Sequence, residues 1–387
     1  MLLIKNGTVI TMENDEILDG TDVLCKDGKI AAIGKNLSAD AEIVDAKGKL
    51  VLPGFVNPHS HVGGFAADGS NDEDLNEITN PVTAGLSAYY GINPDDRAFA
   101  YDAEAGITTS GITPGSANVV GGWVIAFKSA GKDIDTRLVK EPVALKAAMG
   151  INPKGCYGGK QGKLPGSRMG IAQVLREYFL SVKEYRKKKA DALNAPEKKP
   201  KYDLDLEHGI PVLEKKIPLK VHSYHQDMLT VLRIADEFDF QVTLDHALGA
   251  SDFYEELAGN PHLHGVIYGP VGSGIMPGEL CKLDFDCLKG LDNRGVTVSV
   301  MTDGPITNNH VLVDEAGEAV RKGMDPLRAL AMITVNGAKM ILVDDRVGSV
   351  KLGKDADLLV YDGLPTRDLT AVNQMTVIDG TIVYRAS

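Results

Sequence analysis

The chain has 387 residues, of which 43% are hydrophobic and 24% charged, and its 53 acidic and 41 basic side chains give a formal net charge of −12. This composition excludes a disordered chain, because it supplies enough apolar residues to bury a core. The acidic balance argues against a nucleic-acid binder, which neutralises phosphates with basic patches. We expect a globular protein that binds a small molecule and forms two or three domains, or one large barrel with an accessory.

The first residues do not read as a secretory signal, because Lys5 and Asn6 interrupt the apolar residues and no small-residue cleavage pattern follows. No run of about 18 apolar residues, the length that spans a membrane, occurs in the chain. We therefore expect a cytoplasmic protein without a membrane partner. No CxxC pair occurs, which predicts reduced thiols rather than a zinc knuckle or a redox motif, at Cys25, Cys156, Cys281 and Cys287.

Both ends of the chain read as short strands joined by tight turns. Asp27-Gly28 and Asp379-Gly380 each separate two apolar runs, and Asp-Gly supplies the positive φ angles that a two-residue hairpin needs. We expect residues 1–53 and 343–387 to form one small β-sandwich domain together. Residues 54–342 would then be a large insertion between its halves.

Residues 54–342 alternate short apolar runs with helical patterns. Apolar side chains at helical spacing predict helices, for example over 171–185 and directly after Asp325-Pro326. Strands with intervening helices predict an α/β fold, a (β/α)₈ TIM barrel. The eight predicted strands are 51–56, 106–112, 119–127, 142–149, 217–222, 241–246, 264–268 and 296–302.

Residues 183–201 depart from this rhythm, because they combine a run of Lys and Arg with two prolines and few apolar side chains. We interpret them as a solvated helix end and loop. A basic surface for an anionic partner is the alternative, although it would lie within an acidic chain, and the role of this segment stays open.

The sharpest local signal is PGFVNPHSH at residues 53–61. Two histidines at positions i and i+2 of a strand point to the same side of the pleat, so His59 and His61 can reach one cation. Neutral imidazole is a common ligand of zinc-like ions. A single pair of histidines with this spacing also occurs on protein surfaces. Here, however, the pair ends the first predicted barrel strand, and the carboxyl ends of the strands form the face that carries the chemistry of TIM-barrel enzymes.

Other predicted strands end in residues of the same chemical type. Each of them alone has an ordinary explanation, such as a core histidine, a cap or a buried lysine. Together they would converge on one rim of the barrel and form a metal centre with His59 and His61. They are Lys146, His222, His246 and Asp303.

These motifs resemble those of the amidohydrolase superfamily over nearly the whole chain. The resemblance rests on LPGFVNPHSH near the start, VH at the fifth strand, DH at the sixth and MTDGP at the eighth. The tail VGSVKLGKDADLLVYDG is similar to the segment with which these enzymes return to a small β-sandwich domain. The phrases AMGINPKG and RMGIAQVLRE are most similar to the branch that holds imidazolonepropionase and the prolidase-like dipeptidases.

The resemblance implies a role for each residue. His59 and His61 would bind a divalent metal, with zinc as the expected ion, and His222 and His246 would complete the set. Asp303 would be a ligand and also the acid/base that moves the proton of the attacking water. Lys146 lies where binuclear members carry a carboxylated lysine between two metals; a structural lysine is the alternative, so one or two metals per chain stay open.

The expected reaction follows from this site. A bound divalent cation lowers the pKa of water to about 7 and polarises a carbonyl or imine carbon. Asp303 would accept the proton of the water and deliver it to the leaving nitrogen. We expect a metal-dependent hydrolase of C–N bonds in a cyclic amide, an N-acyl amino acid or a dipeptide-like substrate.

His225 bears on the reaction type. Deaminases and imidazolonepropionase of this superfamily typically carry a glutamate three residues after the histidine of the fifth strand, and this chain has His225 there. An imidazole can also move a proton, so His225 is a candidate catalytic residue, whereas a polar residue at a helix start is the alternative. The difference weakens two other functions, a heterocycle deaminase and an imidazolonepropionase-like ring hydrolase.

Two further residues are candidates for substrate binding. Arg168 presents a planar guanidinium that suits a carboxylate, with solvent-exposed charge as the alternative. Tyr224 follows the fifth strand beside the expected metal site. A catalytically silent barrel that binds or assembles is the remaining alternative function, and the identity of the substrate, the metal and any homo-oligomer stays open.

Overall fold

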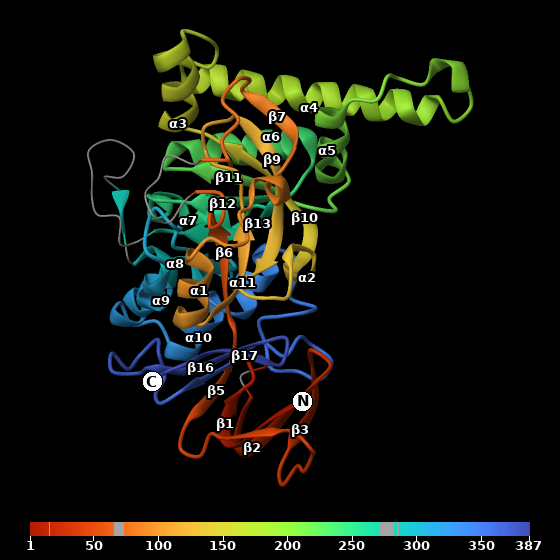
Figure 1. Cartoon of the computed structure of the whole chain (residues 1–387). Coiled ribbons are helices and arrows are strands. Elements are labelled where there is room, and N and C mark those ends of the chain that lie inside the picture. The colour runs from red at the N-terminus through yellow and green to blue at the C-terminus, as the bar shows by residue number, and fades with distance from the viewer. Residues whose placement is uncertain (15, 66–72, 271–281, 285) are drawn as a thin grey trace.

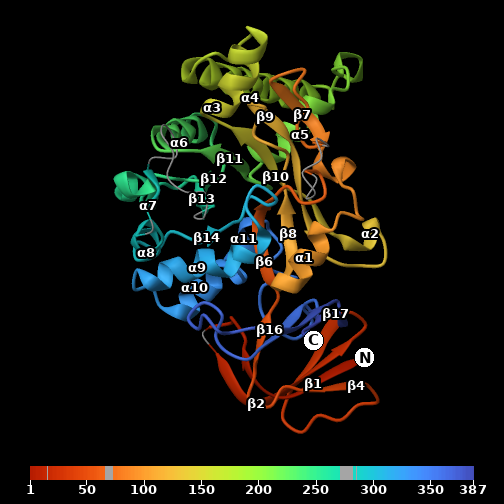
Figure 2. The ribbon, with the colours of Figure 1, turned by 60° about the vertical axis from the view of Figure 1, so that its left-hand side comes forward.

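The computed structural model describes residues 1–14, 16–65, 73–270, 282–284 and 286–387. A terminal sheet at one end of the molecule contains both chain ends, and a barrel sheet with helices around it forms the rest (Figure 1). Figure 2 shows from a second side that strands β16 and β17 lie between the barrel and the N-terminal strands. Cys281 lies outside the described residues, and the other three cysteines are free thiols, as predicted.

The terminal sheet has the strand order β17-β16-β15-β5-β1-β2-β3, with β4 paired to β1. Strand β5 joins the two chain ends, because it pairs with β1 on one side and antiparallel with β15 on the other. The strands are β1 (Leu2–Ile10), β2 (Ile17–Lys26), β3 (Lys29–Gly34), β4 (Glu42–Asp45), β5 (Leu50–Pro53), β15 (Leu358–Tyr361), β16 (Asn373–Ile378) and β17 (Thr381–Arg385).

Both predicted hairpins are confirmed. Strands β2 and β3 are joined by Asp27 and Gly28, whose φ angles are 51° and 77°. Strands β16 and β17 are joined by Asp379 and Gly380, with φ angles of 48° and 71°. Positive φ at both central residues is the turn geometry that matches the twist of paired strands.

The alternation of side chains along β5 and β15 gives the terminal sheet two covered faces. Val51 and Leu358 belong to a core made only of residues from the two chain ends. Their neighbours Leu52 and Leu359 belong instead to the large core that includes the barrel. Successive residues of a strand point to opposite faces, so these strands bind the sheet to the barrel.

The barrel sheet runs from β6 to β14 and contains seven of the eight predicted strands. The first prediction, 51–56, is only partly right, because these residues cover most of β5 in the terminal sheet and only the first two residues of β6. Its first and last strands contact each other, so the eight-stranded barrel is nearly closed. Strand β7 (Val82–Ser87) pairs with β9 from outside this path. The strands are β6 (Phe55–Ser60), β8 (Ile107–Ile112), β9 (Val120–Lys128), β10 (Leu138–Ala148), β11 (Leu219–Ser223), β12 (Val242–His246), β13 (Leu263–Tyr268) and β14 (Val298–Val300).

One strand departs from the predicted (β/α)₈ order. Strand β9 runs antiparallel to both β8 and β10, whereas the other neighbours along the barrel are parallel. Only residues 113–119 connect β8 to β9, and a parallel crossover needs a dozen or more residues. The expectation of a helix after every strand is therefore wrong here: in this fully described stretch the one helix is the short α2 (Ile134–Arg137).

Helices cover the outside of the barrel (Figures 1 and 2). The predicted helix over 171–185 is confirmed as part of α4, and the side chain of Asp325 accepts hydrogen bonds from the first N–H groups of α10, also as predicted. The helices are α1 (Ala98–Ala105), α3 (Ile151–Pro153), α4 (Arg168–Asp191), α5 (Leu204–Leu213), α6 (Gln226–Phe238), α7 (Tyr254–Ala258), α8 (Cys287–Asp292), α9 (Leu312–Arg321), α10 (Pro326–Met332) and α11 (Val335–Met340).

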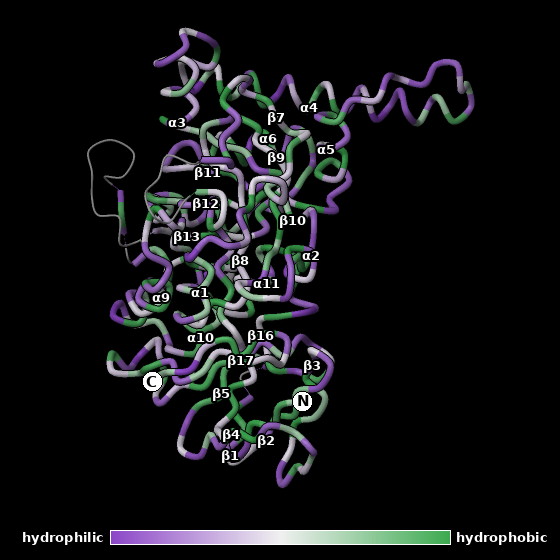
Figure 3. The backbone as a smooth tube through the Cα atoms, in the orientation of Figure 1, coloured by the Kyte–Doolittle hydropathy of each residue, from purple (hydrophilic) through white to green (hydrophobic). Residues whose placement is uncertain are grey.

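The end of α4 projects away from the barrel. Its buried side chains stop at Tyr185, and the last turns with the following loop form a mostly hydrophilic extension (Figure 3). The predicted solvated helix end in residues 183–201 is confirmed. Among the described residues, no helix combines the length and the apolar character that a membrane crossing requires.

A buried ion cluster joins the barrel to the terminal sheet. Nζ of Lys128, at the end of β9, lies 2.8 Å from Asp355 and 3.1 Å from Asp357 and also pairs with Asp379. Burial alone would lower the pKa of Lys128, but Asp357, Asp379 and Asp355 together raise it above its ordinary value. Burial also raises the pKa of Asp357 to about 6 despite the nearby ammonium.

We expect Lys128→Met to lower the free energy of unfolding by about 3–5 kcal/mol, because it leaves the buried carboxylate of Asp357 without its counter-charge. Equilibrium unfolding in urea measures the loss. Lys29→Met is the matched control: Lys29 pairs with Asp355 from a side chain that is 47% exposed, so its loss should stay below about 1 kcal/mol. Equal losses in the two variants would contradict a structural role for the buried cluster.

Candidate metal centre

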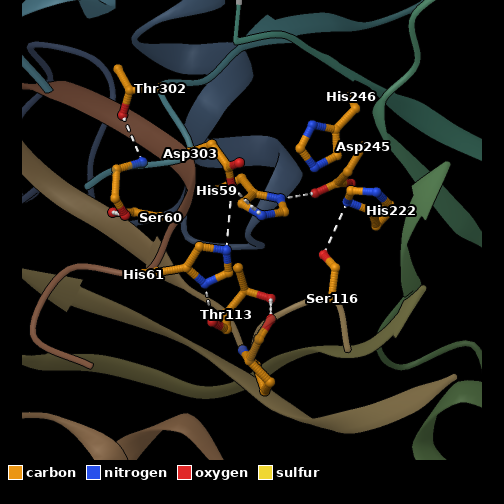
Figure 4. A network of polar contacts seen from close by, with 12 residues as sticks. His59, Ser60, His61, Thr113, Ser116, His222, Asp245, His246, Thr302 and Asp303 are labelled. Carbon is orange, nitrogen blue, oxygen red and sulfur yellow. Dashed lines mark hydrogen bonds and ion pairs between the residues drawn. The ribbon is translucent and has the colours of Figure 1, made fainter. Parts of the chain in front are cut away.

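The candidate site lies where the carboxyl ends of the parallel barrel strands meet (Figure 4). Six predicted residues come from five strands or the positions directly after them, and all but Asp303 are buried. They are His59 and His61 at β6, Lys146 in β10, His222 in β11, His246 at the end of β12 and Asp303 after β14.

Three of these residues form a group that suits a metal ion. Nε2 of His59 and Nε2 of His61 each lie 3.2 Å from Oδ1 of Asp303. One ligand atom from each residue lies within 4.8 Å of the others. The two rings point to the same side of β6, as the i, i+2 spacing predicts, and their centroids are 5.3 Å apart.

The other two histidines extend this group across the barrel end. The ring centroid of His246 lies 5.3 Å from that of His59 and 4.1 Å from that of His222. Burial lowers the pKa of His59 and of His222, and lowers that of His246 to about 3. Three imidazoles, those of His59, His222 and His246, are therefore held in the neutral form that binds metals.

Hydrogen bonds fix which nitrogen of the imidazoles carries the proton. Nδ1 of His61 lies 2.8 Å from the carbonyl of Thr113, and Nδ1 of His246 lies 2.9 Å from the carbonyl of Gly269. A carbonyl only accepts, so each Nδ1 donates, and in the neutral tautomer Nε2 is the nitrogen that carries the lone pair. Nδ1 of His222 faces the hydroxyl of Ser116, which can donate or accept, at 3.0 Å.

The same reasoning applies to His59, whose Nδ1 lies 2.5 Å from Oδ2 of the buried Asp245. Its Nε2 lone pair therefore faces Oδ1 of Asp303. This imidazole lone pair and the carboxylate oxygen, 3.2 Å apart, repel each other unless a cation lies between them.

Unpaired polar atoms also fit a cation at this point. Nε2 of His59, Nε2 of His246 and Oδ1 of Asp303 are buried and make no hydrogen bond within the described part of the chain. A buried polar atom without a partner costs about 1–3 kcal/mol, so such atoms seldom gather without a ligand. The donor set of imidazole nitrogens and a carboxylate suits a divalent transition metal.

Lys146 lies beside this group inside the barrel. It is fully buried, and its Nζ makes no hydrogen bond among the described residues. Burial lowers its pKa to about 8. Its neighbour in register on β11 is Lys220, also fully buried, whose Nζ lies 2.6 Å from Oδ2 of Asp245.

The three remaining predicted residues have different surroundings. The ring of Tyr224 lies 4.9 Å from that of His222, beside the metal group. His225 lies at the start of α6, where Nε2 is 2.9 Å from Asp252 and Nδ1 is 2.9 Å from the amide oxygen of Gln226. The side chain of His225 therefore pairs with residues outside the metal group.

Arg168 is the first residue of α4, and its Nε donates to Oδ1 of the buried Asp227 on α6 at 2.7 Å. This ion pair ties the two helices together.

The sequence analysis missed Asp245 and Lys220. Both are charged residues within buried strands, and Lys220 precedes His222 by two positions, so it points to the same side of β11. This spacing was a usable signal for Lys220. Nothing in the sequence showed that Asp245 would reach across the barrel to His59.

The turn after β14 fixes the position of Asp303. Asp303 has a φ of 56°, and the carbonyl of Gly304 accepts a hydrogen bond of 2.7 Å from the N–H of His61. A Cβ on Gly304 would lie 1.8 Å from Oδ1 of Asn309, which itself accepts a hydrogen bond from Thr302. This turn therefore requires glycine and joins the two ligand-bearing strand ends.

We expect Gly304→Ala to weaken metal binding by about tenfold or more, because the added Cβ displaces the turn that holds Asp303. The metal retained per chain after dialysis, measured by elemental mass spectrometry beside the melting temperature, tests this. Gly317→Ala on α9 is the control: its Cβ would lie 3.7 Å from the nearest atom, so metal binding should not change. Retention of metal by Gly304→Ala at the level of the unmodified chain would refute the role of this turn.

Comparison with known proteins gives consistent matches. Residues 284–384 match the family described as "Amidohydrolase family". The crystal structure of an amidohydrolase from Thermotoga maritima MSB8 is 38% identical, covers 100% of both chains and has a TM-score of 0.93. A prolidase structure with N-methylphosphonate-L-proline is 17% identical over the full length of both chains, with a TM-score of 0.61, which shows a common fold.

Two curated relatives are more distant in sequence than the Thermotoga protein. Amidohydrolase tasK of Hapsidospora irregularis is 26% identical over 94% of this chain, and the match spans only 40% of the length of tasK. The 5-methylthioadenosine/S-adenosylhomocysteine deaminase of Acetivibrio thermocellus is 27% identical over 93% of this chain and 85% of its own length.

Proposed function

The chain belongs to the amidohydrolase family and is a metal-dependent hydrolase acting on C–N bonds, and we propose that it cleaves the amide-type bond of a small cyclic amide, an N-acyl amino acid or a dipeptide. One observation carries the proposal: Nε2 of His59 and Nε2 of His61 each lie 3.2 Å from the Asp303 carboxylate, beside two further histidines. This donor set suits a metal that activates water.

In this proposal His59, His61 and Asp303 hold one divalent metal, with zinc as the expected ion, and His222 and His246 hold a second. A metal bound there would lower the pKa of water and polarise the substrate carbon. Burial lowers the pKa of His59 and of His246, and their hydrogen bonds at Nδ1 leave Nε2 as the nitrogen that would bind the ion.

Asp303 is the proposed acid/base. Its side chain is 13% exposed, whereas those of His59 and His61 are 0% and 4% exposed, so it is the group of these three that a substrate best reaches. With Oδ1 directed at the histidines, the carboxylate would take a proton from water and pass it to the leaving nitrogen. Tyr224, beside His222, would line the substrate side of the site.

Lys146 is proposed as the carboxylated lysine of a two-metal site. Its Nζ has no hydrogen bond among the described residues, while its neighbour Lys220 is paired with Asp245. A neutral amine reacts with carbon dioxide to form a carbamate and release a proton, and burial favours the neutral form of Lys146. The paired ammonium of Lys220 is the less reactive of the two.

Deamination of a heterocycle is the second candidate, because a named deaminase is 27% identical over 93% of this chain. The contacts of His225 argue against it. In a deaminase this residue would shuttle a proton to the ring of the substrate. Here Nε2 of His225 lies 2.9 Å from Asp252 and Nδ1 lies 2.9 Å from the amide oxygen of Gln226. Arg168, engaged with Asp227, would bind a substrate carboxylate only by rearranging this pair.

We also propose that residues 1–53 and 343–387 form a small β-sandwich domain. The separate core made from both chain ends supports this division. Residues 54–342 would carry the complete metal site.

A substrate screen tests the proposed reaction. Zinc-loaded protein is incubated with dipeptides, N-acyl amino acids, cyclic amides and adenosine-type nucleosides, and the released amine or ammonia is measured. We expect turnover in the amide or dipeptide group, with loss on treatment with a chelator and recovery on adding metal. Ammonia release from nucleosides alone would favour the deaminase, and no turnover in any group would count against both.

We expect Asp303→Asn to lower kcat by about 10²–10⁴, because the amide cannot accept the proton of water. Metal content and melting temperature of the variant separate this loss from a loss of the site or of the fold. Activity of Asp303→Asn close to that of the unmodified chain would show that another group moves the proton.

A further inference from the structure

We propose that Asp245 and Lys220 form a positioning pair that fixes the ring of His59 with its Nε2 lone pair directed at the metal. The inference rests on the proposed metal site and adds two residues that do not themselves contact the ion. It assigns a role to a buried charge pair inside the barrel that the reaction does not otherwise use.

The first contact crosses the interior of the barrel. Oδ2 of Asp245 on β12 lies 2.5 Å from Nδ1 of His59 on β6, and neither side chain is exposed to solvent. Strands β6 and β12 are not neighbours in the sheet, so no strand pairing imposes this contact (Figure 4). A carboxylate only accepts, so His59 must donate from Nδ1. The proton is thereby kept away from the nitrogen that faces Asp303.

The second contact holds the carboxylate in place. Nζ of Lys220 on β11 lies 2.6 Å from the same oxygen, Oδ2, and Lys220 is fully buried. Oδ1 of Asp245 accepts a hydrogen bond of 2.9 Å from the hydroxyl of Thr243. Both oxygens are therefore engaged, and the carboxylate has one orientation. A buried carboxylate without a counter-charge would be costly, and Lys220 supplies that charge without contacting His59.

The charge of the pair matters as well as its geometry. A carboxylate that accepts a hydrogen bond from Nδ1–H makes an imidazole a stronger metal ligand. Loss of such a partner typically lowers the metal affinity about 10- to 100-fold. Lys146 provides a contrast, because it neighbours Lys220 in register and yet makes no ion pair among the described residues, whereas Lys220 pairs with Asp245. The pair is thus specific to Lys220.

Metal affinity tests the inference directly. Zinc dissociation constants are measured by competition with a chelating dye for the unmodified chain, Asp245→Leu, Lys220→Met and the double variant. We expect affinity to fall about 10- to 100-fold in each single variant. The double variant should bind no more weakly than Asp245→Leu, because Lys220 acts through Asp245. Independent, additive losses would overturn the inference.

Two further variants separate positioning from folding. Asp245→Asn keeps an oxygen that can accept the Nδ1 proton, so it should recover part of the affinity lost in Asp245→Leu. Lys128→Met removes a buried lysine from the distant ion cluster, so it should lower stability and leave zinc affinity unchanged. If Asp245→Leu does not fold, Asp245→Asn and Lys220→Met still carry the comparison.

The outcomes distinguish the two proposals. Zinc binding by the unmodified chain with unchanged affinity in Asp245→Leu and Lys220→Met would overturn the positioning pair and leave the proposed function standing. Absence of zinc binding by the unmodified, correctly folded chain would overturn the proposed function itself. The visible spectrum of the cobalt-loaded protein gives a second readout, because a rotated His59 ring would change the absorption bands of Asp245→Leu without unfolding it.

Discussion

The arrangement at the carboxyl end of the barrel depends on one electrostatic constraint: Nε2 of His59 and Nε2 of His61 each lie 3.2 Å from the Asp303 carboxylate in a largely buried space. A cation between these groups would attract all three, and the surrounding structure keeps them from turning away. The carbonyls of Thr113 and Gly269 turn His61 and His246 toward that point. The family of the chain and the geometry of the site thus lead to the same chemistry.

The fold supplies this rigidity by joining strands that are far apart in the chain. The N–H of His61 binds the carbonyl of Gly304, which connects the first and last strands of the barrel at the site. Elsewhere in the barrel, Lys128 at the end of β9 forms ion pairs with carboxylates of the terminal sheet and so joins this sheet to the barrel. The terminal sheet therefore stabilises the barrel at a distance from the reaction, and four of the six proposed ligands lie within strands rather than on loops.

Much of this arrangement was predictable from local patterns. Apolar runs located seven of the eight barrel strands and only the start of β6, Asp-Gly pairs located the two hairpins, and the spacing of His59 and His61 placed both rings on one side of a strand. The antiparallel direction of β9 was missed because an apolar run does not indicate which way a strand runs. The link over residues 113–119 was a usable signal, because it is too short for a parallel crossover. Asp245 was missed because its partner His59 lies across the barrel, and periodicity along one strand cannot report such a contact. The pairing of Arg168 with Asp227 depends in the same way on how α4 and α6 pack.

The most direct test of the metal centre is a crystal structure of the zinc-loaded protein with diffraction data collected at the zinc absorption edge. The account predicts an anomalous peak bounded by Nε2 of His59, Nε2 of His61 and the Asp303 carboxylate, and a second peak beside His222 and His246. Density for a carboxylate on Lys146 would accompany the second peak. No anomalous peak between His59, His61 and Asp303 in fully loaded crystals would contradict the central claim.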